Sequence, residues 1–485
     1  MKRIPEVLEH FTNGPFMDVL DLVEHARLSI EDATARIDAR RQTRGVLHDG
    51  LRRWTEHAVT GYLAAFSDHL DMRPVRRRWM YDFRLAAPDA RGAERYQITV
   101  WGRCYTSADG RLRELRLVVN RVRARARTEA EIAVAALVLA SADGDVVPEH
   151  VRIRQFGILE GEFDTLFDGS RQAALDLYQV AGRVALAEIV DGKRDGPDHV
   201  SYRPGTACVD CPFSATCRAL VRVPGLLGLD SPRRPRRSWS PTSARSYSVC
   251  PARQHMRTHR LPADGALEHS PAAERGRAVH RYLEAKHSGL NAAPCTPYVP
   301  RDWVPDGYEL SETDRELGAQ LVRQHSEVCA LSIASGHGAV RVEPDLVYED
   351  ANANVVVLVK PDLLYRDGRE WIWREVKTSV WERRQVPNWF ATYPQLALAV
   401  VLVARGALGG GGRVELEVLR PKGVELITFD PYTPQVRAAA EQAVLDHVHP
   451  WHADNLFAAA PGKHCGTCEV SRWCSFRDES AVEKR

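Results

Sequence analysis

The sequence has no long hydrophobic run and almost no net charge. No stretch approaches the roughly 20 apolar residues of a membrane-spanning helix, and residues 1–6 lack the apolar segment of a secretory signal. We therefore expect a cytoplasmic protein with no membrane partner. Because the formal net charge is only +2, any nucleic-acid binding must come from local basic patches.

What is present is typical of a globular protein. The 485 residues are 44% hydrophobic and 27% charged, enough for two or more buried cores. The basic residues are mostly arginine, whose planar forks suit phosphates, although a GC-rich genome would enrich arginine equally. Ten cysteines in a reducing compartment indicate metal ligands or core thiols rather than disulfides.

Residues 361–377 contain the side chains that most clearly suggest a chemical function. Asp367-Gly368 predicts a two-residue type I′ turn, because both residue types tolerate positive φ. The flanking strands then pair antiparallel, and their side chains alternate between faces. One face gathers Asp362, Trp373, Glu375 and Lys377. Two carboxylates beside a lysine suit a divalent cation and phosphodiester hydrolysis.

Helical and strand patterns alternate through the second half, which predicts an α/β domain with a mixed central sheet and flanking helices. We expect helices at 272–287, 312–332 and 387–404 and another from Pro434, and strands at 338–348, 355–359 and 414–418. Glu415 and Glu417 alternate with apolar residues, so the last strand is expected to be exposed on one face.

Three domains or segments are expected: a first unit at 1–222, a linker rich in Pro, Ser and Arg at 223–243, and a second unit at 244–485. In the first unit, helices are expected at 51–70, 129–139 and 173–190. Residues 96–101 and 115–119 are expected to form a hairpin around Asp109-Gly110.

Pro361-Asp362 and Glu375-Val376-Lys377 resemble the signature of the PD-(D/E)xK nucleases. Further residues resemble the RecB-like branch of that superfamily, which includes AddB and the CRISPR-associated adaptation nucleases. The resemblance implies a restriction-endonuclease-like core and metal-dependent hydrolysis of DNA. The implied catalytic residues are Asp362, Glu375, Lys377 and Gln395. The implied ligands of Mg²⁺ or Mn²⁺ are His280, Glu343, Asp362, Glu375 and the carbonyl of Val376.

These ligands come from motifs around the signature. His280 ends a Gly-x₃-His element on a helix, and Glu343 lies on the expected strand before Asp362. Gln395 matches the glutamine of a Gln-x₃-Tyr element, but Ala399 stands at the tyrosine position. This departure puts substrate contacts on that helix in doubt.

The cysteines frame the same region. One early and three late cysteines, as in RecB-like nucleases of this layout, imply a [4Fe–4S] cluster, and zinc is the competing ligand of four thiolates. The implied set is Cys250, Cys465, Cys468 and Cys474. Cys295 and Cys329 are interpreted as ordinary thiols.

A second cysteine array indicates an internal duplication. Cys208, Cys211 and Cys217 precede Cys465, Cys468 and Cys474 by 257 residues each, and Asp109 precedes Asp367 by 258. At the latter offset, the positions of Glu343, Asp362, Glu375 and Lys377 hold Leu85, Cys104, Leu117 and Val119. We therefore expect a degenerate, inactive first copy that serves as a docking or DNA-binding platform. Its three cysteines are a possible second metal site, or a relic, and Cys250 is a possible partner of either array.

The sequence thus predicts a metal-dependent deoxyribonuclease, exo- or endonucleolytic, acting on single-stranded DNA or DNA ends. By resemblance, it would serve DNA repair or anti-phage defence with a helicase or another defence protein as partner. One alternative is a non-catalytic iron–sulfur subunit that binds nucleic acid or scaffolds a complex. Lys360 favours it, because a salt bridge to the facing Glu375 would compete with metal. A zinc-stabilised interaction protein is a third interpretation.

Overall fold

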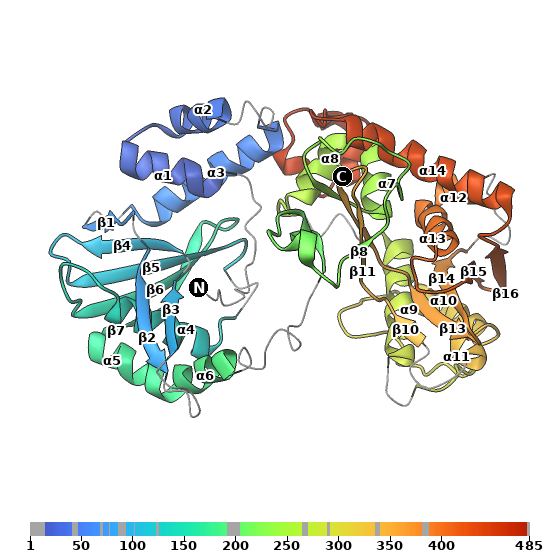
Figure 1. Cartoon of the computed structure of the whole chain (residues 1–485), viewed down its shortest axis with the longest axis horizontal. Helices are drawn as coiled ribbons and strands as arrows, with labels where there is room; N and C mark the ends of the chain where they lie inside the picture. Colours follow the sequence, from blue (N-terminus) through green and yellow to red (C-terminus); the bar gives the residue numbers. More distant parts are fainter. Residues whose placement is uncertain are drawn as a thin grey trace. The chain divides into compact units, whose positions relative to one another are not determined.

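The chain divides into two compact units in the computed structural model (Figure 1). Unit 1 comprises Met1–Ser201, Met256–Ala263 and Arg472–Ser475, and unit 2 comprises Tyr202–His255, Asp264–Ser471 and Phe476–Arg485. The structure describes residues 15–40, 47–67, 71–76, 78–85, 94–100, 102–122, 126–191, 204–263, 270–288, 292–334, 340–380 and 388–482. No helix in these ranges is long and apolar enough to cross a membrane.

Unit 1 contains a five-stranded sheet in the order β1-β4-β5-β6-β7, in which β5 and β6 are parallel and the other neighbours antiparallel. A separate ribbon pairs β2 with β3. The strands are β1 (Met72–Pro74), β2 (Met80–Leu85), β3 (Glu94–Thr99), β4 (Arg103–Ser107), β5 (Leu112–Val119), β6 (His150–Gly157) and β7 (Glu162–Ser170). The helices are α1 (Phe16–Ala26), α2 (Ile30–Arg40), α3 (Asp49–Ala65), α4 (Glu129–Ser141), α5 (Arg171–Leu177) and α6 (Arg183–Asp191).

Unit 2 contains two sheets, in the orders β10-β13-β14-β15-β16 and β8-β11-β12-β9. The strands are β8 (Val221–Arg222), β9 (Arg237–Trp239), β10 (Val340–Val342), β11 (Leu346–Asp350), β12 (Val355–Val359), β13 (Leu363–Asp367), β14 (Glu370–Thr378), β15 (Gly412–Arg420) and β16 (Gly423–Phe429). The helices are α7 (Pro241–Val249), α8 (Pro251–Thr258), α9 (Pro271–His287), α10 (Glu312–His325), α11 (Ala330–Ile333), α12 (Trp389–Thr392), α13 (Pro394–Ala404), α14 (Pro434–Ala453) and α15 (Glu479–Val482). The α8 helix continues from unit 2 into unit 1.

Helices cover both faces of the larger sheet in unit 2, as the alternating pattern predicts. On one face, Trp373 and Leu416 pack with residues of α13 and α14 in the largest hydrophobic cluster. On the other face, Val376 and Leu419 pack with α9 and α10. The mixed α/β architecture expected from the sequence is therefore confirmed.

The five-stranded sheets of the two units have the same topology. Each joins two antiparallel pairs, one parallel pair and a final antiparallel pair, in the same sequential order. A helix follows the third strand of each sheet: α4 after β5, and α13 after β14. The shared topology supports the internal duplication inferred from the repeated cysteine spacing.

The β13–β14 hairpin differs in register from the prediction. Asp367 pairs with Glu370, so the turn is Gly368-Arg369 rather than Asp367-Gly368. Gly368 has a φ of 61°, whereas Arg369 is not among the residues with positive φ. The turn therefore needs glycine only at its first central position, as in a type II′ turn. The shift moves each partner by two residues, so the predicted faces are kept.

Several element boundaries predicted from the sequence were wrong. In unit 1, the hairpin around Asp109-Gly110 joins β4 to β5, while residues 94–99 belong to the β2–β3 ribbon. In unit 2, the helix expected at 312–332 ends at His325 and is followed by α11. The strand expected at 338–348 is two strands, β10 and β11, with Glu343 between them.

The segment 223–243 is not an unstructured linker. Within unit 2, β9 pairs with β12, and the side chains of Leu227 and Trp239 are buried. The carboxylate of Asp350 also accepts hydrogen bonds from the backbone N–H groups of Gly225 and Leu227. A few apolar side chains and backbone pairing outweigh the Pro- and Arg-rich composition that predicted a linker.

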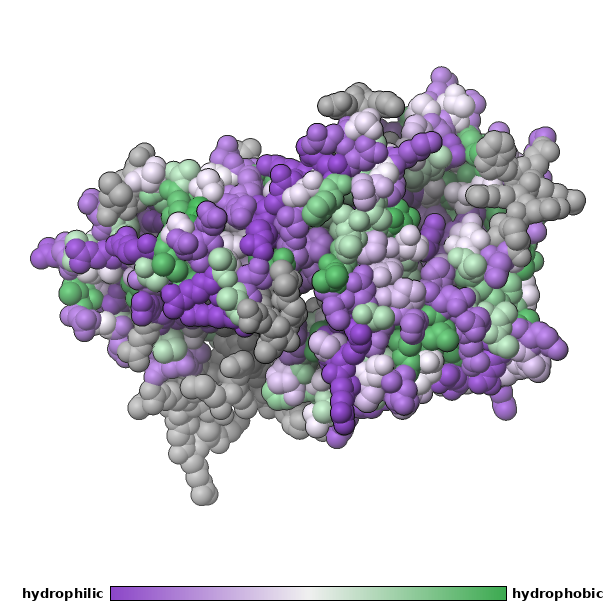
Figure 2. Space-filling view, turned by 90° about the horizontal axis from the view of Figure 1, so that it is seen from above, coloured by the Kyte–Doolittle hydropathy of each residue, from purple (hydrophilic) through white to green (hydrophobic). Residues whose placement is uncertain are grey.

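Hydrophobic and hydrophilic side chains alternate over the face seen in Figure 2, without one dominant apolar patch. Among the described residues, the most exposed large hydrophobic side chains are Val180, Tyr298, Leu456 and Phe213. Isolated apolar side chains of this kind are usual on protein surfaces. This surface pattern therefore points to no particular partner.

A buried arginine joins the central strands of unit 2. Arg374 of β14 is fully buried and donates to the carboxylates of Glu415 and Glu417 on β15, so the expectation of an exposed strand was wrong. The paired position in unit 1 has the opposite charge: buried Glu114 of β5 accepts from Arg152 of β6. Each unit thus has an ion pair across its parallel strands, with the acidic and basic residues on opposite strands.

We predict that Arg374→Ala lowers the free energy of unfolding of unit 2 by about 3 kcal/mol, because two buried carboxylates lose the cation that they share and keep only Arg413 and His325. Urea denaturation followed by tryptophan fluorescence measures this change. Arg369→Ala, at the exposed tip of the same hairpin, is the control and should change it by less than about 0.5 kcal/mol. Equal effects of the two variants would contradict the role of Arg374.

Candidate nuclease site

The site lies where the two sheets of unit 2 meet. Strand β10 of the larger sheet continues into β11 of the smaller one through Glu343, and β12 returns to β13 through Asp362. The N–H of Glu343 donates to the carbonyl of Asp362 at 3.2 Å, so the two junctions are adjacent. Glu343 has a φ of 44°, a conformation that non-glycine residues seldom adopt and that is common at functional sites.

Strand β14 brings Glu375 and Lys377 to the same place. The ammonium of Lys377 lies 3.2 Å from Oδ2 of Asp362 and 3.3 Å from Oε2 of Glu375. It also donates to the carbonyl of Val376 at 2.9 Å. The family resemblance implied that these three oxygens bind a metal ion, and in the structure all three lie around the ammonium of Lys377.

Neighbouring groups hold the two carboxylates in position. The N–H of Val376 donates to Oδ2 of Asp362 at 2.7 Å. The indole of Trp373 donates to Oε1 of Glu375 at 3.0 Å. The expected common face of Trp373, Glu375 and Lys377 is thus visible in their contacts, and each carboxylate keeps an oxygen toward Lys377.

Helix α9 supplies His280. Ser270 caps this helix by accepting from the N–H of Ala273, and Pro271 occupies its first turn. Nδ1 of His280 lies 3.7 Å from Oδ1 of Asp362. The two residues line one small cavity of about 20 Å³, together with Glu284, Glu343 and Val376. A space of this size holds about one water molecule.

The charges of the site depend on one another. Burial and, after it, the neighbouring Asp362 carboxylate raise the pKa of Glu375 to about 7. Burial also opposes ionisation of Asp362, but the charge of Lys377 above all holds its pKa below the usual value. Burial opposes the charge of Lys377, but the two carboxylates raise its pKa, so it stays protonated. Burial lowers the pKa of His280, which favours the neutral ring that binds metals.

The sequence predicted that Lys360 faces Glu375, but it does not. Its ammonium pairs with the carboxylate of Glu343 instead. The change follows from the register shift of the hairpin, which places Glu375 opposite Asp362 rather than opposite Lys360. Competition between a lysine salt bridge and a metal ion therefore concerns Glu343, which leaves Glu375 with Lys377.

Gln395 lies in the first turn of α13, which packs on the sheet face that carries Trp373. It is partly exposed and makes none of the hydrogen bonds described for Asp362, Glu375 and Lys377. Ala399, at the position of the family's tyrosine, is fully buried in the core. The helix lies within the range expected from the sequence, but contacts between its side chains and a substrate stay a prediction.

Each cysteine array lies in or beside two short 3₁₀ segments: Thr206–Val209 and Ser214–Thr216 for the first array, and Lys463–Thr467 and Ser471–Trp473 for the second. In unit 2, Cys250, Cys465 and Cys468 are buried, and burial raises the pKa of the Cys468 thiol to about 11. Cys474 is partly exposed. Cys208 and Cys217 pack against Val356 of β12, and Cys211 is partly exposed.

The equivalent place in unit 1 is apolar. The ladders align Tyr105 with Leu363, so Cys104 takes the position of Asp362, as expected. The sequence predicted Leu117 and Val119 at the positions of Glu375 and Lys377. Because the hairpin of unit 1 is two residues shorter, Leu115 and Leu117 take these positions instead. The position of Glu343 is taken by Val75, rather than Leu85. These four side chains belong to one hydrophobic cluster and offer no carboxylate: Val75, Cys104, Leu115 and Leu117.

Sequence reasoning missed one group of metal-ligand side chains. It contains His287, Cys295, His325 and Cys329, and its ligand atoms all lie within 4.8 Å of one another. Among the described residues, no other group of His, Cys, Asp or Glu meets this criterion. The spacings His-x₇-Cys and His-x₃-Cys were the available signal.

Comparison with known proteins supports the nuclease fold of unit 2. Residues 238–475 match the family model of the PD-(D/E)XK nuclease superfamily. No curated protein matches the chain.

Two solved structures are similar in part. The crystal structure of SSO0001 shares 15% identity over 50% of this chain and 87% of its own, with a TM-score of 0.27. A protein from Eubacterium rectale, provisionally named an exonuclease, shares 15% identity over 44% of this chain and 79% of its own, with a TM-score of 0.30. At TM-scores this low, neither likeness carries an argument.

The matched residues enclose the hairpin, both sheet junctions and α9. The segment 238–475 is thus a domain of the PD-(D/E)XK nuclease superfamily.

Proposed function

We propose that this protein is a divalent-metal-dependent DNA nuclease of the RecB-like type, with its active site in unit 2. The observation that carries the proposal is the convergence of Asp362, Glu375 and the Val376 carbonyl on the ammonium of Lys377. Such a gathering of oxygens around one cationic centre, inside a nuclease-superfamily domain, is what phosphodiester hydrolysis requires.

The donor set fits Mg²⁺ or Mn²⁺. Two carboxylates and a backbone carbonyl are hard oxygen ligands, and the neutral ring of His280 suits Mn²⁺ as well. Glu343 lines the same cavity and supports the site. When bound, a divalent ion lowers the pKa of water and stabilises negative charge on a phosphate.

Lys377 has two tasks in this proposal. Its positive charge, maintained by the two carboxylates, attracts the scissile phosphate and stabilises the charge that develops during hydrolysis. Its hydrogen bonds to Asp362 and Glu375 also orient those carboxylates. The N–H of Val376 and the indole of Trp373 keep the carboxylates from rotating away.

Unit 1 is proposed to be a degenerate, inactive copy. The apolar cluster at its equivalent position cannot hold a divalent cation, because hard cations need oxygen ligands. Unit 1 then serves as a docking or DNA-binding platform.

The family resemblance alone supports single-stranded DNA or DNA ends as the substrate and a helicase or defence protein as the partner. The same holds for a role in DNA repair or anti-phage defence.

Cys250, Cys465, Cys468 and Cys474 are proposed to hold a [4Fe–4S] cluster. Cys250 and Cys468 both influence the charge of Arg253 electrostatically, which supports their closeness within unit 2. Zinc is the alternative occupant. Lys360 pairs with Glu343 and leaves Glu375 at the site, which argues against the non-catalytic iron–sulfur scaffold.

We predict that labelled single- or double-stranded DNA is cut by anaerobically prepared protein with Mn²⁺ or Mg²⁺. The Asp362→Ala, Lys377→Ala double variant should cut at least about 100-fold more slowly, because it removes a carboxylate and the stabilising cation. Asp367→Ala, on the exposed part of the same hairpin, should retain full activity.

The nuclease proposal fails if the double variant cuts as fast as the wild type. It also fails if neither protein cuts while the wild type binds DNA and carries iron. The second outcome would favour the iron–sulfur scaffold.

We predict that Cys465→Ser lowers the iron content of anaerobically purified protein from about four atoms per chain to near zero, since a cluster seldom survives the loss of one thiolate. Elemental analysis and the visible absorbance of the cluster measure this. Cys104→Ser, which removes a buried thiol of unit 1, should keep its iron. A wild type that contains zinc and no iron would refute the cluster.

A further inference from the structure

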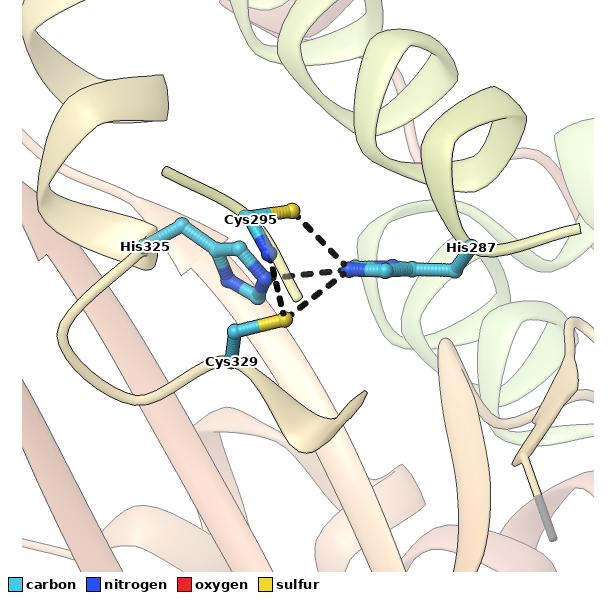
Figure 3. Close-up of side chains that lie close together, drawn as sticks. All are labelled: His287, Cys295, His325 and Cys329. Atoms are coloured by element: carbon cyan, nitrogen blue, oxygen red, sulfur yellow. Dashed lines mark hydrogen bonds between the residues drawn. The ribbon is translucent and has the colours of Figure 1, made fainter. Parts of the chain in front are cut away.

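Four metal-ligand side chains of unit 2 meet beside the proposed catalytic cavity, and two of them, His287 and His325, also line it. Figure 3 shows His287, Cys295, His325 and Cys329 pointing toward one another. His287 ends α9 and His325 ends α10, while Cys329 precedes α11 and Cys295 lies in the loop segment 292–300. The sequence interpretation of the two cysteines as ordinary thiols did not foresee this meeting.

The distances from His287 to the other three ligand atoms match those of a tetrahedral zinc site. Nε2 of His287 lies 3.2 Å from Nε2 of His325, 3.4 Å from Sγ of Cys295 and 3.6 Å from Sγ of Cys329. Zinc bonds of ordinary length in a tetrahedron place two nitrogens about 3.3 Å apart, and a nitrogen and a sulfur about 3.6 Å apart. Each observed distance agrees with these values within about 0.2 Å.

Hydrogen bonds alone do not account for this arrangement. The Nε2 atom of His287 faces three other ligand atoms, but a neutral ring has at most one proton there. Cys329, His325 and His287 are all buried, so water molecules do not supply the hydrogen-bond partners that their ligand atoms lack. Buried polar atoms normally have hydrogen-bond partners. One cation bound by all four side chains would take the place of those hydrogen bonds.

A carboxylate behind the cluster fixes one ligand. Nδ1 of His325 lies 2.6 Å from Oε1 of Glu417, so Nδ1 carries a proton and Nε2 presents its lone pair to the cluster. Glu417 is held in turn by Arg374. Metal-binding histidines commonly have such a carboxylate on their outer nitrogen. The outer nitrogen of His287, Nδ1, has no hydrogen-bond partner among the described atoms.

We propose that His287, Cys295, His325 and Cys329 bind one structural Zn²⁺ ion. Two neutral imidazoles and two thiolates form a closed tetrahedral set, which suits zinc better than Mg²⁺ or Mn²⁺. Binding forms two Zn–N and two Zn–S bonds and releases the two thiol protons to solvent. The ion joins α9, the segment 292–300 and the loop between α10 and α11. The site is distinct from the four cysteines assigned to iron, and it does not depend on the proposed nuclease activity.

The test is the zinc content of the full-length protein, measured by elemental analysis after purification without chelators. We expect the Cys295→Ser, Cys329→Ser double variant to contain about one zinc atom per chain less than the wild type. Cys104→Ser and Asp362→Ala should keep the wild-type zinc content, because neither residue belongs to the cluster. Equal zinc in the wild type and the double variant overturns the proposal.

A second measurement covers the case in which the double variant does not fold. Co²⁺ added to zinc-depleted wild-type protein should give the intense visible bands of a tetrahedral site and thiolate-to-cobalt charge transfer, and added Zn²⁺ should abolish them. Cobalt spectra without these bands overturn the proposal. A disulfide between Cys295 and Cys329 in protein purified under reducing conditions overturns it too, because the two thiolates would then be unavailable.

Discussion

The antiparallel pairing of β13 with β14 is the constraint on which the candidate site depends. It places Asp362, at the start of one strand, against Val376 of the other, so that a backbone N–H holds the carboxylate. The alternation of side chains along β14 then directs Glu375 and Lys377 to the same side. A slip of one residue would turn both away from Asp362. The buried contacts of Arg374 with β15 help to keep this register.

The junction between the two sheets supplies the rest of the site. Because β10 leads into β11 of the smaller sheet and β12 of that sheet leads back into β13, Glu343 and Asp362 lie at the same bend. Helix α9 crosses this bend with His280 toward the carboxylate and His287, two turns later, toward the proposed zinc site. One helix therefore contributes to both proposed metal sites. Unit 1 has the same topology but carries Leu115 and Leu117 in place of Glu375 and Lys377, so the fold alone does not supply the charged side chains of the candidate site.

Local patterns were sufficient for much of the fold and for part of the site. Alternation and turn residues located the hairpin, and the shared face of Asp362, Glu375 and Lys377 survived an error in the turn because the shift was by two residues. Glu415 and Glu417 were predicted to be exposed, since composition does not reveal that Arg374 lies across the parallel ladder from them. The four residues around His287 were missed for the same reason. Their closeness results from the packing of α9, α10 and a loop, which no local spacing encodes.

The central claim is that the β13–β14 hairpin of unit 2 binds a divalent cation through oxygen ligands. It is tested most directly by titrating the protein with Mn²⁺ and measuring free Mn²⁺ by electron paramagnetic resonance. The account predicts that Asp362→Ala, Glu375→Ala abolishes a binding site that Asp367→Ala, Glu370→Ala, at the tip of the same hairpin, retains. Unchanged Mn²⁺ binding after loss of Asp362 and Glu375 would contradict it.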